Sequence, residues 1–490
     1  MIRYDDMLKT HKEVGEVVGL DRGLAYVTGL PQAVLNEIIV FESGTFGQVY
    51  SLGEDRIEVL LIEREEPQIF EKAARTKKTP AIGVGPGLLG KVLDPLGRPL
   101  DGEEPLEFEK ELPLDSLPLG IDNRSRITEM MITGVAMVDL VVPLGRGQRE
   151  LVIGDRKTGK TSFLLQTIRS QVDHGTVCVY GAIGKNQAEV KAVVESFRLS
   201  KIADKILVIA SFSSDPSGLI VQTPYAAMTA AEYFRDQGRD VLVVLDDLTT
   251  HAKFYREIAL LAGRFPGRDS YPADMFYQHA RLLERAGSFK ADKGGSKTIT
   301  CLPVAESLEG DITGLIQTNL MSMTDGHIFF DSNIFTKGRR PAVNPFLSVT
   351  RVGRQTQDKV GRGISHELSS LLVLYEKSET FSHFGAEMSE GMKMTMNTGK
   401  NIYDFFRQSS FETVPLFMQY LLFTFVWIGY WNSKEEGQMR RDIQKACAKY
   451  RSSKTVRQVV DDLCQGSGSL NELLGKVQKN LRNLESDLFL

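Results

Sequence analysis

Residues 151–162 read LVIGDRKTGKTS, in which Gly154, Gly159, Lys160 and Thr161 follow the spacing G-x-x-x-x-G-K-T. Loops with this spacing wrap the phosphates of a nucleoside triphosphate, because glycines let backbone N–H groups approach the anion closely. An apolar run precedes the loop and the helical stretch TSFLLQTIRSQV follows it, so these N–H groups converge at the positive end of a helix. The segment therefore predicts a phosphate-binding loop between a strand and a helix.

The side chains around this loop indicate how a nucleotide and a metal ion are held. We expect Lys160 to bridge the β- and γ-phosphates and the Thr161 hydroxyl to ligate Mg²⁺. The run DVLVVLDDL, residues 240–248, contains Asp246, which is placed to hold Mg²⁺ through water, and Asp247, which is expected to cap the next helix. The predicted ligands are ATP or ADP and Mg²⁺, and the predicted loop residues are Gly154, Asp155, Arg156, Lys157, Thr158, Gly159, Lys160, Thr161 and Ser162.

Hydrolysis needs a further group, a carboxylate that orients and polarises the attacking water. In sheet enzymes with such a loop it can follow the next strand, which here reads VCVYGAIGKNQAE, residues 177–189. Lys185 stands at the exposed end of this strand, and a protonated lysine cannot act as a base. The first carboxylate, Glu189, comes about one helical turn later and is expected to face solvent. The sequence therefore predicts a site that binds a nucleotide without cleaving it.

The composition of the 490-residue chain is that of an ordinary soluble protein, with 42% hydrophobic and 25% charged residues. A formal net charge of −4 gives no overall attraction to nucleic acid or to anionic lipid. The four cysteines form no C-x-x-C pair, and Cys178 and Cys301 lie in apolar runs, which favours buried thiols in a reducing compartment. The N-terminal stretch has no apolar core, so no secretory signal is expected.

The order of strand-like and helical stretches predicts three domains. Residues 12–72 alternate in a strand-like manner between turns, which is typical of a small barrel, and the Gly- and Pro-rich segment 77–106 indicates a linker. Continuous apolar runs alternate with helical stretches from about residue 140 to 350, which favours a parallel sheet covered by helices, and the remainder is helical. The predicted domains are a β-barrel at 1–75, an α/β domain at 76–357 and an all-α bundle at 358–490.

The segment TVPLFMQYLLFTFVWIGYWNS, residues 413–433, carries no charge and is long enough to cross a membrane. Polar Gln419 and Asn432, together with Pro415 and the helix-weakening Gly429, favour a buried helix in a soluble domain instead. We therefore expect this segment to lie in a protein core.

Six stretches of the chain resemble one family. They read VGPGLLGKVLDPLGRPLDG, VPLGRGQRELVIGDRKTGKTS, EYFRDQGRDVLVVLDDL, FPGRDSYPADMFYQHARLLERAG, TDGHIFF and LSVTRVG. With them the chain resembles the alpha subunit of the F-type rotary ATP synthase from about residue 14 to beyond residue 430. The resemblance implies an N-terminal β-barrel, a central RecA-like P-loop domain and a C-terminal helical bundle. It also implies an alternating hexamer with catalytic beta-type subunits around a gamma-type shaft, peripheral to the membrane on its cytoplasmic face.

The same resemblance assigns roles to residues outside the loop. Arg351 in LSVTRVG matches the arginine finger that acts in the catalytic site of a neighbouring beta subunit, and Ser348 is expected to position its loop. Arg340, Pro341 and Gln408 match residues of the nucleotide pocket, and Ser410 stands where the family has a second glutamine.

The chain also departs from the family. Lys157 and Lys185 stand where alpha subunits usually have glutamine. These two cations could tighten anion binding, or they could themselves occupy a site that holds nucleotide less often. The N-terminal extension before the barrel is short, which leaves the peripheral-stalk partner open. Phe417 and Met418 replace common glutamates, and we hypothesise that this apolar face meets an additional or altered partner.

Three functional hypotheses follow. The leading one is a non-catalytic, nucleotide-binding subunit of a rotary ATP synthase that touches the membrane only through the ion-translocating sector. The alternative is a self-sufficient homohexameric ATPase of the secretion or RNA-tracking type. That alternative requires a water-activating carboxylate, and the RNA-tracking form also requires a basic, aromatic-rich barrel surface that the sequence lacks. A structural protein with a relic site is the third. The coupling ion and the physiological direction are not encoded in this chain.

Overall fold

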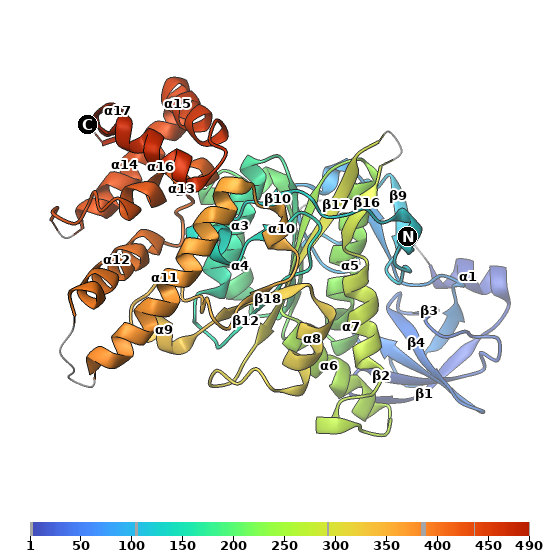
Figure 1. The fold of residues 1–490 in the computed structure, drawn as a ribbon. Coiled ribbons are helices and arrows are strands. Elements are labelled where there is room, and N and C mark those ends of the chain that lie inside the picture. Colours follow the sequence, from blue (N-terminus) through green and yellow to red (C-terminus); the bar gives the residue numbers. More distant parts are fainter. Residues whose placement is uncertain (1–2, 103–105, 292–293, 384–388, 436, 490) are drawn as a thin grey trace. The chain divides into compact units, whose positions relative to one another are not determined.

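The computed structural model describes residues 3–102, 106–291, 294–383, 389–435 and 437–489 (Figure 1). The chain divides into two compact units. The first unit comprises residues 1–125, 175–306 and 312–324, and the second comprises 126–174, 307–311 and 325–490. The α/β elements of the chain are divided between these two units.

The first unit begins with a closed six-stranded barrel, shown in blue in Figure 1. Its strands follow the order β1-β2-β5-β4-β3-β6, and alternate side chains point into a core that contains Val17, Val27 and Val59, all fully buried. This alternation is the pattern that predicted a barrel, because successive residues of a strand face opposite sides. The elements are helix α1 (Tyr4–His11) and strands β1 (Gly15–Asp21), β2 (Leu24–Thr28), β3 (Ile38–Phe41), β4 (Phe46–Leu52), β5 (Ile57–Leu61) and β6 (Lys72–Arg75).

A parallel sheet forms the rest of the first unit, in the order β8-β14-β13-β15-β17, with β16 antiparallel to β17. All six residues of β15 are buried, since helices such as α5 pack against the sheet, and this explains the continuous apolar runs. Cys178 and Cys301 are buried in β13 and β17, as expected. The strands are β7 (Ala81–Val84), β8 (Val92–Leu93), β9 (Lys110–Pro113), β13 (Val177–Lys185), β14 (Ile206–Phe212), β15 (Val241–Asp246), β16 (Gly287–Lys290) and β17 (Ser296–Glu306). The helices are α4 (Gln187–Leu199), α5 (Ser217–Asp236), α6 (Leu248–Leu261), α7 (Met275–Glu284) and α8 (Leu315–Met323), with short 3₁₀ turns at Pro86–Leu88, Ile121–Asn123, Ala203–Lys205 and Arg268–Ser270.

The Gly- and Pro-rich segment 77–106 is more than the expected linker. Val92 and Leu93 form strand β8, which pairs with β14, and strand β7 pairs with β9. Gly97 belongs to a tight turn that follows β8, and its φ of 83° favours glycine. Asp94 closes this turn by accepting hydrogen bonds from the N–H groups of Leu96 and Arg98.

The second unit contains five short strands and most of the helices. Strand β12 pairs in parallel with β18, β18 pairs antiparallel with β19, and β10 pairs with β11. The strands are β10 (Met130–Met131), β11 (Leu144–Gly145), β12 (Leu151–Gly154), β18 (Gly326–Phe330) and β19 (Val349–Thr350). The helices are α2 (Ala136–Val141), α3 (Lys160–Asp173), α9 (Ser332–Thr336), α10 (Gly353–Thr356), α11 (Lys359–His383), α12 (Glu390–Phe406), α13 (Leu416–Trp427), α14 (Gln438–Ser452), α15 (Lys454–Gln465), α16 (Leu470–Lys479) and α17 (Leu481–Phe489). The predicted fold class, with barrel, α/β and helical parts, is confirmed.

The apolar segment 413–433 forms the buried helix α13, as expected. Helices α2, α11, α12, α14, α15 and α16 all pack against it. Met418 is fully buried and Phe417 is half-buried against the edge of the Tyr420 ring. Met418 is therefore not part of an exposed apolar face, so the hypothesis is wrong for this residue. An additional or altered partner at the half-buried Phe417 stays a prediction. Within the described residues, no helix is both long enough and apolar enough to cross a membrane.

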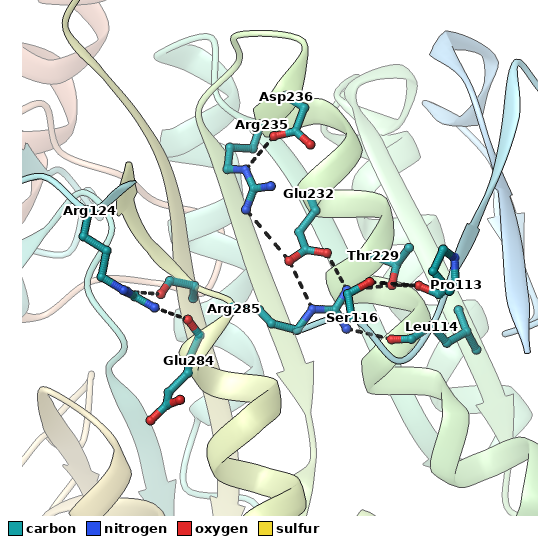
Figure 2. A network of polar contacts seen from close by, with 11 residues as sticks. Pro113, Leu114, Ser116, Arg124, Thr229, Glu232, Arg235, Asp236, Glu284 and Arg285 are labelled. Carbon is teal, nitrogen blue, oxygen red and sulfur yellow. Dashed lines mark hydrogen bonds and ion pairs between the residues drawn. The ribbon is translucent and has the colours of Figure 1, made fainter. Parts of the chain in front are cut away.

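A buried ion pair joins α5, the end of α7 and the segment after β9 (Figure 2). The guanidinium of Arg285 is 1% exposed and contacts the Glu232 carboxylate, the Thr229 hydroxyl at 2.7 Å and the Leu114 carbonyl at 2.8 Å. Arg235 also approaches Glu232, at 3.8 Å. Because Arg285 satisfies three groups that water does not reach, its removal leaves several buried polar atoms unpaired.

We predict that Arg285→Met lowers the free energy of unfolding by about 3–5 kcal/mol, since Glu232 loses its closest counter-charge in a buried site. Urea unfolding followed by circular dichroism measures this loss. The matched control is Arg281→Met on the same helix, where the ion pair with Asp115 is partly exposed (21% and 55% for the two side chains) and is expected to contribute less than about 1 kcal/mol. Equal losses in the two variants would contradict the prediction.

Two histidines form a second buried polar contact, between α6 and α7. His251 Nδ1 lies 3.0 Å from His279 Nε2, and His251 Nε2 lies 3.2 Å from the Val221 carbonyl oxygen. Since a carbonyl only accepts, His251 donates from Nε2 and accepts at Nδ1 from His279, which leaves His279 Nδ1 without a hydrogen-bond partner among the described residues. Burial lowers the pKa of both imidazoles, that of His251 to about 4 and that of His279 well below its usual value.

This pair predicts a loss of stability in mild acid. Below the ordinary histidine pKa of 6.5, His251 and His279 bind protons in the unfolded chain but stay neutral in the folded chain. The free energy of unfolding therefore falls as the pH drops from 6.5 toward 4. Each group contributes a slope of up to about 1.4 kcal/mol per pH unit. We expect His279→Gln to reduce this slope in urea unfolding between these pH values, while His366→Gln, at an exposed position on α11, leaves it unchanged. If His279→Gln leaves the slope unchanged, groups other than this histidine pair cause the acid sensitivity.

Candidate functional site

The loop between β12 and α3 has the conformation that its glycines allow. A Cβ atom at Gly154 would lie 2.3 Å from the Phe330 carbonyl oxygen on the neighbouring strand, so only glycine fits there. Gly159, with φ of 99°, and Lys157, with φ of 61°, adopt the left-handed conformation that turns the chain into the helix. The predicted strand, loop and helix are thus all present, and α3 begins at Lys160, one residue before the expected position.

The loop side chains divide into an inner and an outer group. The ammonium of Lys160 is buried and donates to the carbonyl oxygens of Gly154 at 2.6 Å and Asp155 at 2.7 Å. Thr158 donates to the Asp155 carbonyl at 2.7 Å, which closes the turn. On the outer side, Arg156, Lys157 and Thr161 are exposed and Ser162 is half-buried. The N-terminal end of α3, which is the positive end of its dipole, therefore lies beside exposed cationic and hydroxyl side chains, which suits an anion.

Asp155 stabilises the phosphate-binding loop through two contacts that the sequence did not predict. Its carboxylate accepts a hydrogen bond from the Ser307 hydroxyl at 2.6 Å and another from the Gly310 N–H at 3.0 Å. Burial acts to raise the pKa of Asp155, but the hydrogen bonds from Ser307 and Gly310 outweigh it and hold the pKa below its usual value. Sequence reasoning placed Asp155 in the loop and missed Ser307, because 152 residues separate the two in sequence.

The residues predicted for the rest of the nucleotide pocket lie on two neighbouring loops. The backbone N–H of Gln408 donates to the Arg340 carbonyl at 3.1 Å, so the structure brings Arg340, Pro341 and Gln408 together. The Arg340 guanidinium lies 3.3 Å from the centre of the Phe335 ring, and Ser410 is exposed. Burial, reinforced by nearby Arg407, lowers the pKa of Arg340.

Helix α3 ties this pocket to the phosphate-binding loop. Gln166 of α3 donates to the carbonyl oxygens of Ser409 at 2.8 Å and Glu412 at 2.7 Å. Gln408 itself is buried, and its amide donates to the carbonyls of Gly134 and Glu412 and accepts from the Ala136 N–H. The amide of Gln408 therefore holds the backbone in place, and its predicted contact with a base stays a prediction.

Arg351 directly follows β19, on a loop that hydrogen bonds hold to β18. The Ser348 hydroxyl donates to the Asn344 carbonyl at 2.7 Å and accepts from the Phe329 N–H at 2.9 Å, and the Arg351 N–H donates to the Asp325 carbonyl at 3.0 Å. The side chain of Arg351 is exposed, and its guanidinium makes no hydrogen bond or ion pair within the described part of the chain. Ser348 thus links Asn344 to β18, and its predicted role in positioning the loop stays a prediction.

Sequence reasoning missed the buried groups next to this loop. Glu150 is fully buried, accepts a hydrogen bond from Gln148 at 2.6 Å, and has a second carboxylate oxygen without a hydrogen bond in the described residues. Burial raises the pKa of Glu150 well above its usual value, although the Gln148 hydrogen bond and the charge of Arg351 act in the opposite direction. A charged residue at the start of the apolar run RELVIG was the available signal.

Asp246, the acidic residue predicted for the metal ion, belongs to the first unit. Asp246 is buried at the end of β15, where the Tyr180 hydroxyl lies 2.6 Å from one carboxylate oxygen and the Lys185 ammonium 2.8 Å from the other. Asp247 caps α6 by accepting from the Thr250 N–H at 2.6 Å, as expected. Burial opposes the charge of Lys185, but attraction to Asp246 and Asp247 and hydrogen bonds to them raise its pKa above the usual value.

The structure tests one expectation about this part of the first unit, the exposure of Glu189. Glu189 is exposed on the first turn of α4, as its position in the sequence indicated. Within the ranges that the structure describes, no group of three or more His, Cys, Asp or Glu side chains is arranged to hold a metal ion.

Comparisons with known proteins decide the family. A model described as the ATP synthase alpha/beta family, nucleotide-binding domain, matches residues 134–350, and a model of the ATP synthase alpha/beta chain, C terminal domain, matches residues 357–483. ATP synthase subunit alpha of Dictyoglomus turgidum is 40% identical over 423 residues, which span 86% of this chain and 83% of that protein. The chain belongs to the ATP synthase alpha subunit family. ATP synthase subunit alpha of Staphylococcus aureus strain JH9 is similarly related, with 39% identity over 420 residues, 85% of this chain and 83% of that protein.

The two matched domains contain most of the residues described above. The nucleotide-binding domain of this alpha-type chain contains the phosphate-binding loop, Asp246, Arg340 and Ser348, and Arg351 follows its last matched residue. The C-terminal domain contains Gln408. The resemblance inferred from the sequence motifs is therefore confirmed, and so is nucleotide binding as the property of this domain.

The hydrogen bonds of Asp155 with Ser307 and Gly310 predict a measurable effect on nucleotide affinity. Asp155→Ala removes the acceptor for Ser307 and Gly310, so the loop loses its anchor, and we expect the affinity for ATP to fall about tenfold, or ~1.4 kcal/mol. Titration with a fluorescent ATP analogue measures the change. Asp173→Ala, at the exposed last residue of α3, is the control and is expected to bind as the unchanged chain does. An unchanged affinity in Asp155→Ala would show that the hydrogen bonds of Asp155 with Ser307 and Gly310 do not contribute to nucleotide binding.

Proposed function

We propose that this chain is the non-catalytic, nucleotide-binding alpha-type subunit of a rotary ATP synthase. In this proposal Arg351 completes the catalytic site of a neighbouring beta-type subunit. The observation that carries it is the exposed guanidinium of Arg351 on a loop held by Ser348 and Asp325. An exposed guanidinium on a loop whose backbone is fixed is suited to neutralise the charge that develops on a transferred γ-phosphoryl group.

The absence of catalysis in the chain's own site is the second part of the proposal. The strand end where a water-activating carboxylate is expected has Lys185, whose ammonium is engaged by Asp246. Glu189 is exposed on α4 and makes no hydrogen bond that would aim it at a water molecule within the described residues. Both observations support a site that retains ATP or ADP without priming water.

The assembly follows from the proposed role. An arginine that acts in another subunit requires alternation with beta-type chains, and we propose a hexamer of alternating subunits around a gamma-type shaft. The complex would lie on the cytoplasmic face of the membrane and contact the bilayer through its ion-translocating sector. Among the ligands, ATP and ADP are proposed for the phosphate-binding loop, with the exposed Thr161 hydroxyl available to a Mg²⁺ ion that a nucleotide carries in.

The test of this proposal compares Arg351→Ala with Arg354→Ala. Both side chains are exposed and lie three residues apart, so Arg354 controls for the loss of a surface charge. In a complex with beta- and gamma-type partners we expect ATP turnover to fall about a thousandfold in Arg351→Ala and to stay within about twofold in Arg354→Ala.

Two further readouts separate the proposal from a self-sufficient ATPase. The chain alone is expected to show almost no turnover, and nucleotide binding by Arg351→Ala is expected to match that of the unchanged chain. Strong ATPase activity of the isolated chain would favour a homohexameric enzyme, and full activity of the Arg351→Ala complex would overturn the role of the finger.

A further inference from the structure

Two groups that could pair with each other lie on neighbouring segments of the second unit. One oxygen of the Glu150 carboxyl group, Oε1, has no hydrogen-bond partner within the described residues, although the side chain is fully buried. The exposed guanidinium of Arg351 makes no hydrogen bond or ion pair within the same residues. A buried oxygen without a donor costs free energy, so it points to a donor that reaches it in another state of the protein.

Three adjacent strands place Glu150 beside the segment that carries Arg351. Strand β12 begins one residue after Glu150 and pairs with β18, and β18 pairs with β19 through Gly326 and Thr350. A Cβ atom at Gly326 would lie 2.7 Å and 2.8 Å from the two carboxyl oxygens of Glu150, and it would also meet the Val349 carbonyl oxygen. The carboxyl group therefore occupies the space that this glycine leaves, next to the strand that ends directly before Arg351.

Gln148 holds one side of the carboxyl group. Its amide nitrogen donates to Glu150 Oε2 at 2.6 Å and lies 3.4 Å from the Thr350 hydroxyl oxygen. The amide oxygen of Gln148 accepts from the Gly145 N–H at 2.7 Å, which fixes the amide in turn. Oε2 of Glu150 is thus engaged, and Oε1 is the oxygen that can accept from a further donor.

The charge of Arg351 already acts on this carboxyl group. Burial raises the pKa of Glu150 well above its usual value, and the nearby charge of Asp325 adds to this rise. The Gln148 hydrogen bond and the positive charge of Arg351 act in the opposite direction. Burial therefore favours the neutral form while the guanidinium points outward, and an approaching guanidinium favours the ionised form.

The charged groups on the adjoining strands do not replace Arg351 in this role. Arg149 donates to both carboxylate oxygens of Asp325, at 2.8 and 3.1 Å, so its guanidinium is engaged there. His327 on β18 also lies near Arg351, and burial lowers its pKa, so its imidazole is neutral above the usual histidine pKa of 6.5. At neutral and alkaline pH, His327 therefore contributes no change of charge.

We propose that Glu150 is a positioning residue for Arg351, because its Oε1 offers the guanidinium an acceptor inside its own subunit that competes with the phosphoryl group of the neighbouring site. An ionised Glu150 draws the guanidinium inward, and a neutral Glu150 leaves it free to point outward. The inference rests on the role of Arg351 in the proposed function, and it identifies the group that decides when the finger is available.

The first experiment follows the protonated carboxyl group of Glu150 in the purified full-length chain. Infrared spectroscopy detects the C=O stretch of a neutral carboxylic acid, and Glu150→Gln identifies the band by removing it. Since the guanidinium favours ionisation, Arg351→Ala is expected to move the midpoint of this titration to higher pH by about one pH unit or more. Arg354→Ala removes the same charge at another exposed position and is expected to leave the midpoint unchanged.

The second experiment measures ATP turnover at saturating ATP by the complex with beta- and gamma-type partners, between about pH 6 and pH 9.5. As Glu150 ionises it retains Arg351, so turnover of the unchanged complex is expected to fall about tenfold toward alkaline pH. Glu150→Gln has the same shape but cannot ionise, and its complex is expected to fall less than about twofold. Glu129→Gln, which removes a carboxylate at an exposed site of the same unit, is expected to keep the alkaline fall.

The outcomes separate this inference from the proposed function. If Arg351→Ala leaves the infrared midpoint unchanged, the guanidinium does not reach Glu150 and the inference is overturned, while the role of the finger stands. The same conclusion follows if the Glu150→Gln complex shows the full alkaline fall. If the Arg351→Ala complex keeps full activity, the proposed function fails and the inference fails with it, even where the infrared titration shows that the two groups interact. The infrared comparison changes only exposed arginines, so it does not depend on a substitution in the core.

Discussion

The ion pair between Arg149 and Asp325 fixes the frame on which the second unit is built. Arg149 lies just before β12 and contacts both carboxylate oxygens of Asp325, at 2.8 and 3.1 Å, and Asp325 lies just before β18. The Asp325 carboxylate also accepts from the Arg149 N–H, and its carbonyl oxygen accepts from the N–H of Arg351. One aspartate therefore aligns the strand that leads into the phosphate-binding loop with the loop that carries the outward-facing arginine.

The two segments that Asp325 aligns have different proposed roles. In our proposal the loop after β12 holds the chain's own nucleotide, and Arg351, which follows β19 on a segment that Ser348 holds to β18, presents its guanidinium to another molecule. Strands β12 and β18 are hydrogen-bonded neighbours in parallel register, so the two loops extend from adjacent strands.

Local sequence patterns predicted those features that depend on neighbours along the chain. The G-x-x-x-x-G-K-T spacing located the loop, the alternation before residue 72 indicated the barrel, and Asp247 caps α6 because it stands where a strand ends and a helix begins. Pairings between distant segments were not predictable. Ser307 contacts Asp155 from 152 residues away, and nothing next to Lys185 in sequence reveals that its ammonium binds Asp246. The domain boundaries and the roles of individual site residues stay predictions.

The amide of Gln408 has a consequence for which bases the pocket tolerates. Both of its hydrogens are bound by the carbonyls of Gly134 and Glu412, so it has no free donor with which to read the edge of a purine. The N–H groups of Gln408 therefore cannot tell adenine from guanine. Its amide acts instead on the protein, by joining the backbone at Gly134 and Ala136 to the backbone at Glu412.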